Sequence, residues 1–165
     1  MVTNRHVMPH PKSILFVCLG NICRSPSAEA VMRAKCQNLD IVFDSAGTAG
    51  YHIGEAPDPR AVKVGARFGY DLSTLRARQV TAADFGKFER IFAMDENNLQ
   101  NLEKLRQKFI QSQPAHTPVA TLSLFDDFTK QSVADPYYGD EQDFIAQFEH
   151  ISRVAERWLE LWRTH

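Results

Sequence analysis

Short apolar runs and longer amphipathic stretches alternate along this chain. Four apolar runs, at residues 14–17, 41–46, 90–94 and 119–125, have the length of buried strands. The stretches between them carry apolar residues at helical spacing, most clearly near the end of the chain. There the apolar side chains recur at steps of three and four: Phe144, Phe148, Ile151, Ala155, Trp158 and Trp162. We expect this last helix to bury its aromatic stripe in the core.

Local signals mark where the helices begin and end. Residues typical of helix starts occur at five places: Ser25-Pro26, Asp58-Pro59, Thr81 to Asp84, Asp95 and Asp140. Gly69 is expected to end the second helix, because glycine accepts the left-handed backbone found there. Since strands alternate with helices, the pattern predicts an α/β fold of three layers, with a four-stranded parallel sheet and helices on both faces.

Length and charge narrow the class of protein. The chain has 165 residues, enough for one domain, and a formal net charge of -1, which gives no reason to expect nucleic-acid or membrane binding. No apolar run approaches the length of a membrane span. Residues 1–12 include His6 and His10 but no apolar segment, so we expect a flexible N-terminal extension rather than a signal peptide. Residues 13–165 are then a single domain.

The three cysteines, Cys18, Cys23 and Cys36, fit neither a disulfide framework nor a zinc site, because their number is odd and their spacing is wrong. Cys36 falls on the apolar face of the first predicted helix and is expected in the core. A chemically active free thiol favours a reducing compartment, so we expect a cytoplasmic protein. No metal or cofactor is expected.

The stretch from Ser13 to Pro26 combines a strand, a tight turn and a helix start. Its turn contains Gly20-Asn21, residues that accept a positive φ. The backbone N–H groups of the turn can form a concave nest beside the helix N-terminus, and both features attract an oxyanion. The predicted phosphate-binding residues are therefore Leu19, Gly20, Asn21, Ile22, Cys23, Arg24 and Ser25.

Cys18 and Arg24 give this loop its chemistry. Arg24 supplies a planar fork that matches two phosphate oxygens, and Cys18 lies at the base, where the positive field favours a thiolate. The thiolate can attack phosphorus and form a cysteinyl-phosphate. Each well-aimed transition-state donor contributes ~3–4 kcal/mol, so the loop and Arg24 are expected to dominate catalysis.

A carboxyl group is also needed to protonate the leaving oxygen, which accelerates such reactions by roughly 100- to 10,000-fold. Asp135 is well presented, because Pro136 stiffens the chain and Gly139 ends the turn. Other carboxylates at the ends of predicted elements compete with it, although capping is their usual role: Asp95, Asp126, Asp127 and Asp140. Spacing alone leaves this choice open.

At this point the motifs resemble a known family, the low-molecular-weight protein tyrosine phosphatases. Residues 17–26, with the sequence VCLGNICRSP, resemble its signature. Its other landmarks are similar to four further segments, which follow in family order: residues 44–48, 77–79, 94–95 and 135–139. The resemblance extends from Ser13 to Arg163 and implies a parallel sheet with the strand order 2-1-3-4.

The resemblance also implies roles for single residues. Cys18 would be the nucleophile, Arg24 the phosphate ligand and Asp135 the general acid. Asn21 would hold the loop shape with Ser45 as a supporting partner, and Ser25 would donate its hydroxyl to Cys18. The implied cleft walls are Tyr51 and Tyr137, with Tyr138 nearby. Cys23 would be the redox partner of Cys18 in a reversible, protective disulfide.

The implied substrate is a phosphotyrosine-containing protein or a small aryl phosphate, with inorganic phosphate as product and a monomer or weak dimer as the working form. One departure stands out: many family members carry a histidine shortly before the Ala-Arg-Gln segment, where this chain has Leu75 and neighbours without histidine. The outer support of Ser25 is therefore the open part of the predicted site.

Three other readings remain open at this stage. Arsenate reductases share the fold but relay a disulfide through further cysteines, and only Cys36 lies outside the loop here. Protein-arginine phosphatases carry threonine where this chain has Ile22. A phosphocarrier or a non-hydrolytic phosphate-binding module has no use for an acid such as Asp135, because it must keep its phosphate.

Overall fold

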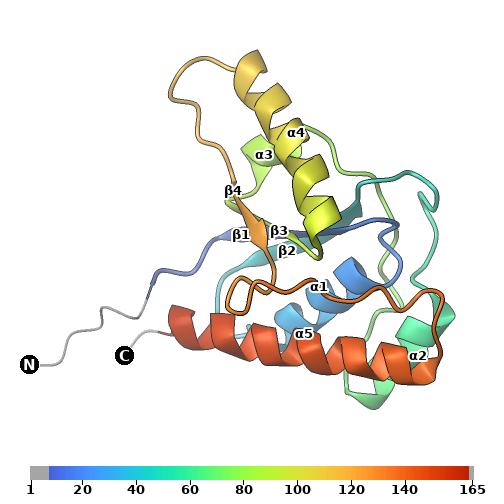
Figure 1. Ribbon diagram of the computed structural model, residues 1–165. Coiled ribbons are helices and arrows are strands. Elements are labelled where there is room, and N and C mark those ends of the chain that lie inside the picture. The colour runs from blue at the N-terminus through green and yellow to red at the C-terminus, as the bar shows by residue number, and fades with distance from the viewer. Residues whose placement is uncertain (1–7, 164–165) are drawn as a thin grey trace, which may run out of the picture.

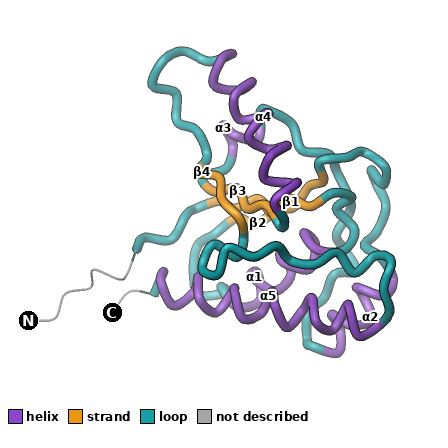
Figure 2. The backbone as a smooth tube through the Cα atoms, in the orientation of Figure 1, coloured by secondary structure: helices purple, strands orange, loops and turns teal. Residues whose placement is uncertain are grey.

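A computed structural model describes residues 8–163. Its four strands are all parallel and form one sheet in the order β2-β1-β3-β4, as the resemblance implied. The strands, drawn in orange in Figure 2, are β1 (Ser13–Cys18), β2 (Val42–Gly47), β3 (Arg90–Ala93) and β4 (Thr121–Leu124). Each is joined to the next by a segment that contains at least one helix, which is what a parallel sheet requires.

Helices cover both faces of the sheet, which confirms the predicted layers (Figure 1). One face is covered by α1 (Arg24–Lys35), α2 (Pro59–Arg67) and α5 (Glu141–Trp162). The other is covered by α3 (Asp84–Lys87) and α4 (Glu96–Ser112). Within the described range, no helix is both long and apolar enough to cross a membrane.

Side chains alternate along β1, so that the strand serves two cores. Ile14 and Phe16 pack in the cluster on the α1 and α5 side, whereas Leu15 and Val17 pack in the cluster under α4. The aromatic stripe of α5 lies in the first cluster, as its periodicity predicted, and its members are at most 3% exposed. Both faces of the central strand are therefore fixed in place by packing.

Several predicted helix ends are confirmed by hydrogen bonds. The side chains of Asp58, Asp95 and Asp140 cap α2, α4 and α5, and Gly69 follows α2 with a φ of 90°. The start of α1 was predicted wrongly. Cys23, not Ser25, is its N-cap, and the hydroxyl of Ser25 is turned inward. The helix begins earlier because this serine bonds to the loop instead of to helix amides.

Of the predicted extension, residues 1–7 lie outside the described range. The backbone of Met8 donates to the carbonyl of Leu161 (2.7 Å), and that of Lys12 donates to the Glu89 carboxylate (2.8 Å). The flexibility of the N-terminal extension stays a prediction.

The carboxyl ends of the strands are where ligands bind in folds of this class. At that end β1 leads into the loop before α1, and β3 leads into the N-cap of α4.

Candidate active site

The loop between β1 and α1 has the shape that its sequence predicted. Asn21 adopts a positive φ of 59°, and its backbone N–H donates to the sulfur of Cys18 (3.3 Å). The loop returns so close to the end of β2 that a Cβ on Gly47 would lie 2.7 Å from the carbonyl of Leu19. Cys18 thus ends a buried strand, with its sulfur facing the turn and the first amides of α1 beside it.

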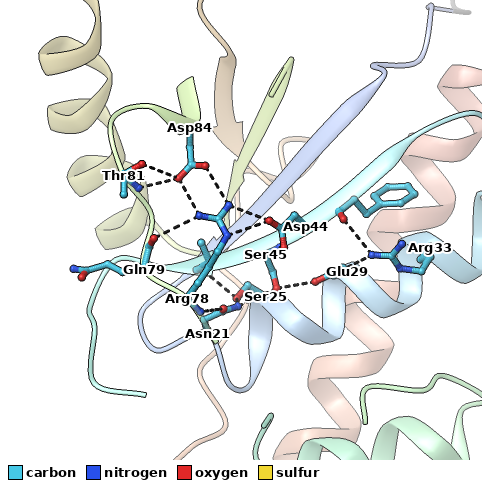
Figure 3. A network of polar contacts seen from close by, with 12 residues as sticks. Asn21, Ser25, Glu29, Arg33, Asp44, Ser45, Arg78, Gln79, Thr81 and Asp84 are labelled. Carbon is cyan, nitrogen blue, oxygen red and sulfur yellow. Dashed lines mark hydrogen bonds and ion pairs between the residues drawn. The ribbon is translucent and has the colours of Figure 1, made fainter. Parts of the chain in front are cut away.

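The side chain of Asn21 connects the loop to its neighbours (Figure 3). Its Oδ1 accepts from the backbone N–H of Arg78 (2.9 Å), which fixes the orientation of the amide. Its Nδ2 therefore faces two hydroxyls, those of Ser25 (2.8 Å) and Ser45 (3.0 Å), and donates to both. Because Ser25 accepts from Asn21, its own proton can be donated, and the Cys18 sulfur at 3.0 Å lies closer than its other acceptor, the Ala46 carbonyl at 3.4 Å.

The outer end of this network is a carboxylate, that of Glu29. The histidine that many family members carry before the Ala-Arg-Gln segment is missing from this chain. Ser45 donates to Oε1 of Glu29 (2.8 Å), and the other carboxylate oxygen accepts from Arg33 one turn further along α1. Burial raises the pKa of Glu29, while the bonds from Ser45 and Arg33 act against that shift. An ionised Glu29 can only accept, so it fixes the direction of the Ser45 proton, just as the Arg78 N–H fixes the direction of the Asn21 amide.

A second set of ion pairs holds the segment that supplies the Arg78 N–H. The Arg78 guanidinium pairs with Asp44 (3.0 Å) after the start of β2 and with Asp84 (3.1 Å) at the start of α3. Asp84 is buried and also accepts from the backbone of Thr81 (2.8 Å). The segment is thereby fixed against both β2 and α3 (Figure 3).

Arg24 is buried, and its hydrogen bonds are made by one nitrogen of the guanidinium. Its Nη1 donates to Asp95 Oδ2 (2.6 Å) and to the carbonyl of Val133 (3.2 Å). Its buried Nε has no hydrogen-bond partner among the described residues, and Nη2 lies 3.5 Å from Asp135 Oδ2. Burial alone would lower the pKa of Arg24, but the negative groups Cys18, Asp95 and Asp135 raise it above its ordinary value. A permanent cation therefore presents a free edge.

The structure separates Asp135 from its four competitors. Asp95 and Asp140 cap helices, Asp127 pairs with Lys130, and Asp126 is buried against Thr129 and His150. Asp135 lines the pocket that contains Cys18 and Arg24, with a side chain that is 40% exposed. Its Oδ1 accepts from the backbone N–H of Tyr137 (3.1 Å), which orients the carboxylate.

The pocket has a volume of about 200 Å³. Its base contains Cys18, Arg24 and four of the other predicted loop residues: Leu19, Gly20, Ile22 and Cys23. Its walls contain all three predicted tyrosines, Tyr51, Tyr137 and Tyr138, and also His52. Tyr51 is 73% and Tyr138 94% exposed, so the walls are open to a large substrate. Asn21 and Ser25, also predicted as phosphate-binding residues, and Ser45 are buried and do not line the pocket.

The three cysteines differ in their surroundings. All three are free and buried. Burial raises the pKa of Cys36 to about 11, and burial together with the Asp58 charge raises that of Cys23 even further. Cys36 packs in the core as predicted and takes no part in the pocket.

Sequence reasoning missed His52 as a wall and Glu29 and Arg33 as the outer end of the network. His52 belongs to no recognisable motif in the sequence. It lies beside Gly20 only because the loop that contains Tyr51 folds back over the phosphate-binding loop. Glu29 and Arg33 could have been noticed as an i,i+4 pair, but a pair of this kind is usually a surface feature. Only the fold shows that its glutamate is buried behind Ser45.

Comparison with known proteins gives one consistent result. A family model described as low molecular weight phosphotyrosine protein phosphatase matches residues 13–164. The low molecular weight phosphotyrosine protein phosphatase of Dictyostelium discoideum is 41% identical over 164 residues, which cover 90% of this chain and 92% of that protein.

Solved structures of phosphatases with two different printed activities share this fold. A protein tyrosine phosphatase from Entamoeba histolytica, with Hepes in its active site, aligns with a TM-score of 0.78 and 38% identity over 90% of this chain and 94% of that one. The Drosophila arginine phosphatase DARP aligns with a TM-score of 0.82 and 29% identity, over 92% and 98% of the two chains.

The substitution Glu29→Gln tests the hydrogen-bond network behind the loop, because it replaces an acceptor of both Ser45 and Arg33 by an amide. Arg33 can only donate, so it will hold the glutamine oxygen and turn the glutamine N–H₂ toward Ser45. The Ser45 hydroxyl then faces two donors, Asn21 Nδ2 and the new amide, and its own buried proton has no acceptor. An unsatisfied buried donor of this kind destabilises the folded site by ~1–3 kcal/mol. We expect kcat/KM for para-nitrophenyl phosphate to fall about tenfold, which corresponds to ~1.4 kcal/mol.

Two matched variants check this prediction. Glu156→Gln removes another α1-facing ion pair, with Lys35, away from the pocket, and should keep full activity. Adding Arg33→Met to Glu29→Gln frees the glutamine to rotate and should restore part of the loss. Wild-type activity in Glu29→Gln would contradict the assigned direction of the hydrogen bonds.

Proposed function

This chain belongs to the low molecular weight phosphotyrosine protein phosphatase family, and we propose that Cys18, Arg24 and Asp135 carry out its hydrolysis of phosphotyrosine. The family match decides between the classes that the sequence left open, in favour of a cysteine-dependent protein tyrosine phosphatase. The observation that carries the proposal for the residues is their shared pocket. A thiol, an arginine with a free edge and a carboxylate line it together.

In the first step the Cys18 thiolate attacks the phosphorus atom. The S–P bond forms as the bond between phosphorus and the tyrosine oxygen breaks, and Asp135 gives its proton to that oxygen. The hydrogen bonds from Asn21 N–H and the Ser25 hydroxyl stabilise the negative sulfur before the attack. The products of this step are a neutral phenol and a cysteinyl-phosphate.

In the second step water attacks the cysteinyl-phosphate. Asp135, now ionised, takes a proton from the water, the P–O bond forms, and the S–P bond breaks with its electrons returning to sulfur. Inorganic phosphate leaves and the Cys18 thiolate is regenerated. The same carboxylate therefore serves both steps, and each step balances without a cofactor.

Arg24 and the loop amides stabilise the charge that spreads over the equatorial phosphate oxygens in both transition states. Asp95 and the Val133 carbonyl hold one end of the guanidinium, so that Nε and Nη2 are left for two oxygens. Each such donor is worth roughly 3–4 kcal/mol. Because these donors are already in place, we expect Arg24 to lower the activation free energy more than ionisation of the Cys18 thiol does.

The tyrosines of the pocket support an aryl substrate. Tyr51 and Tyr137 would contact the two faces or edges of the substrate ring, and Tyr138 would meet residues beside it. We propose a phosphotyrosine-containing protein as the substrate and a monomer or weak dimer as the working form. The need for a free thiol supports the reducing cytoplasm as its location.

Replacing the nucleophile by Cys18→Ser should abolish steady-state turnover of para-nitrophenyl phosphate, because a serine hydroxyl is not ionised near neutral pH. Binding of inorganic phosphate should persist, since Arg24 and the loop amides remain. Near-wild-type turnover in this variant would refute the covalent mechanism, and loss of phosphate binding would show that the loop itself had changed.

Asp135→Ala should lose activity selectively for poor leaving groups. Phenolate needs a proton as it departs, whereas para-nitrophenolate is stable without one, so kcat/KM should fall by roughly 100-fold or more for phenyl phosphate and much less for para-nitrophenyl phosphate. Asp127→Ala, in the same loop but paired with Lys130, is the matched control. Equal losses on both substrates would point to a different acid.

We also propose Cys23 as the redox partner of Cys18. Peroxide oxidises the Cys18 thiolate to a sulfenic acid, and the Cys23 thiol displaces hydroxide from it as water, leaving a disulfide. Peptide mass spectrometry after peroxide treatment should show Cys18–Cys23, with activity restored by a dithiol reductant. A Cys18–Cys36 disulfide, or irreversible sulfonic acid alone, is the result that removes this role.

A further inference from the structure

The loop that carries Asp135 is attached before the acid, where Val133 N–H donates to the carbonyl of Met94 (2.8 Å), and at the acid itself, which lies 3.5 Å from Arg24 Nη2, but residues 136–139 make few polar contacts. Within the loop, Tyr137 N–H donates to Asp135 and Gly139 N–H donates to the carbonyl of Pro136 (2.9 Å). These bonds shape the turn but do not attach it to anything. Among the described residues, the hydrogen bonds that reach residues 136–139 from outside the loop come from one side chain, that of Arg60.

Arg60 lies in the first turn of α2 and uses its whole guanidinium. Nη2 donates to the carbonyl of Tyr137 (2.9 Å) and Nη1 to that of Gly139 (3.3 Å). Its charged plane also lies over two rings, at 4.7 Å from the centroid of Phe144 and 5.7 Å from that of Tyr137. The same side chain thus contacts the loop backbone, a wall of the pocket and the start of α5.

The other edge of Arg60 faces the phosphate-binding loop through Asp58. Nε and Nη2 bind the two carboxylate oxygens of Asp58 at 3.1 and 2.9 Å. Asp58 is buried, and its backbone N–H donates to the carbonyl of Ile22 in the phosphate-binding loop (2.8 Å). Burial alone would raise the pKa of Asp58, but the bonds and charge of Arg60 outweigh it and lower that pKa.

We propose that Arg60 is a positioning residue that fixes the Asp135 loop at the correct distance from the phosphate-binding loop. The chain of contacts runs from Ile22 through Asp58 and Arg60 to the Tyr137 and Gly139 carbonyls. The inference rests on the proposed role of Asp135 and extends it, since it names what holds that acid in place. Arg60 does not line the pocket, so its effect on the reaction is indirect.

This role predicts a particular pattern of loss. Without Arg60 the phosphate still meets an intact Cys18 and Arg24, so attack on a good leaving group is preserved. Proton transfer from Asp135 suffers, because a displacement of the order of 1 Å in a catalytic group can cost about 100-fold. The defect should therefore appear where protonation of the leaving oxygen matters, as it does for Asp135→Ala itself.

The test compares Arg60→Met with Arg67→Met. Arg67 lies on the same helix, is half exposed and pairs with Glu141 of α5 at 2.9 Å, so it controls for the loss of an arginine that links α2 to the start of α5. We expect Arg60→Met to lower kcat/KM for phenyl phosphate by about 10- to 100-fold and that for para-nitrophenyl phosphate by less than about threefold. Arg67→Met should match wild type on both substrates.

A double variant shows whether Arg60 acts through Asp135. In the Asp135→Ala background, Arg60→Met should change kcat/KM for phenyl phosphate by less than about twofold, since two changes to one unit are not additive. An equal loss on both substrates, an undiminished loss in the double variant, or no loss at all overturns the proposal. Failure of Asp135→Ala to discriminate the substrates would instead refute the acid, independently of Arg60.

Arg60→Lys keeps the test decisive if the methionine variant does not fold. Lysine retains the charge near Asp58 but lacks the fork, so it cannot hold Asp58 and both carbonyls together. The Arg60→Lys variant should also lose kcat/KM selectively for phenyl phosphate, by a smaller factor than Arg60→Met. Full activity of a folded Arg60→Lys enzyme on both substrates would show that charge alone suffices and would overturn the positioning role.

Discussion

The side chain of Asn21 is the contact on which the rest of the site depends. One amide group binds the Arg78 backbone, the Ser25 hydroxyl at the start of α1 and the Ser45 hydroxyl on β2, while its own backbone N–H reaches the Cys18 sulfur. Four segments that are distant in sequence therefore meet at one residue with a positive φ. The Asn21 amide cannot turn over without leaving the Arg78 N–H and the two hydroxyls badly paired, so the loop is held in shape before phosphate arrives.

Three arginines lie around this loop and differ in how many of their donors are bound within the protein. Arg24 is buried, with one edge fixed by Asp95 and one edge free, which suits a ligand that brings two negative oxygens. Arg78 and Arg60 have their forks filled by carboxylates and carbonyls, and each holds a neighbouring segment against the loop. Because Nε and Nη2 make no hydrogen bond among the described residues, Arg24 can offer both donors to a phosphate.

Much of this could be predicted from the sequence, because the decisive features are local. The strand, the positive φ of Asn21 and the caps at Asp58, Asp95 and Asp140 depend on neighbours within a few residues, and the periodicity of α5 follows from its buried face. The early start of α1 could not be predicted, because Ser25 bonds inward to Cys18 and not to its own helix. Glu29, His52 and Arg60 also escaped, since their partners Ser45, Gly20 and Tyr137 are brought together only by the parallel sheet and its returning loops.

The central claim is that phosphate passes through a covalent bond to Cys18 in this preorganised loop. The most direct measurement is a rapid quench of the enzyme in alkaline denaturant, where an S–P bond survives, during turnover of an aryl phosphate with a radiolabelled phosphoryl group, followed by peptide mapping at alkaline pH. The account predicts transient label on the peptide that contains Cys18, formed at the same rate at which the phenol is released. Label on another residue, or release of phenol and phosphate together with no labelled protein at any time, would contradict it.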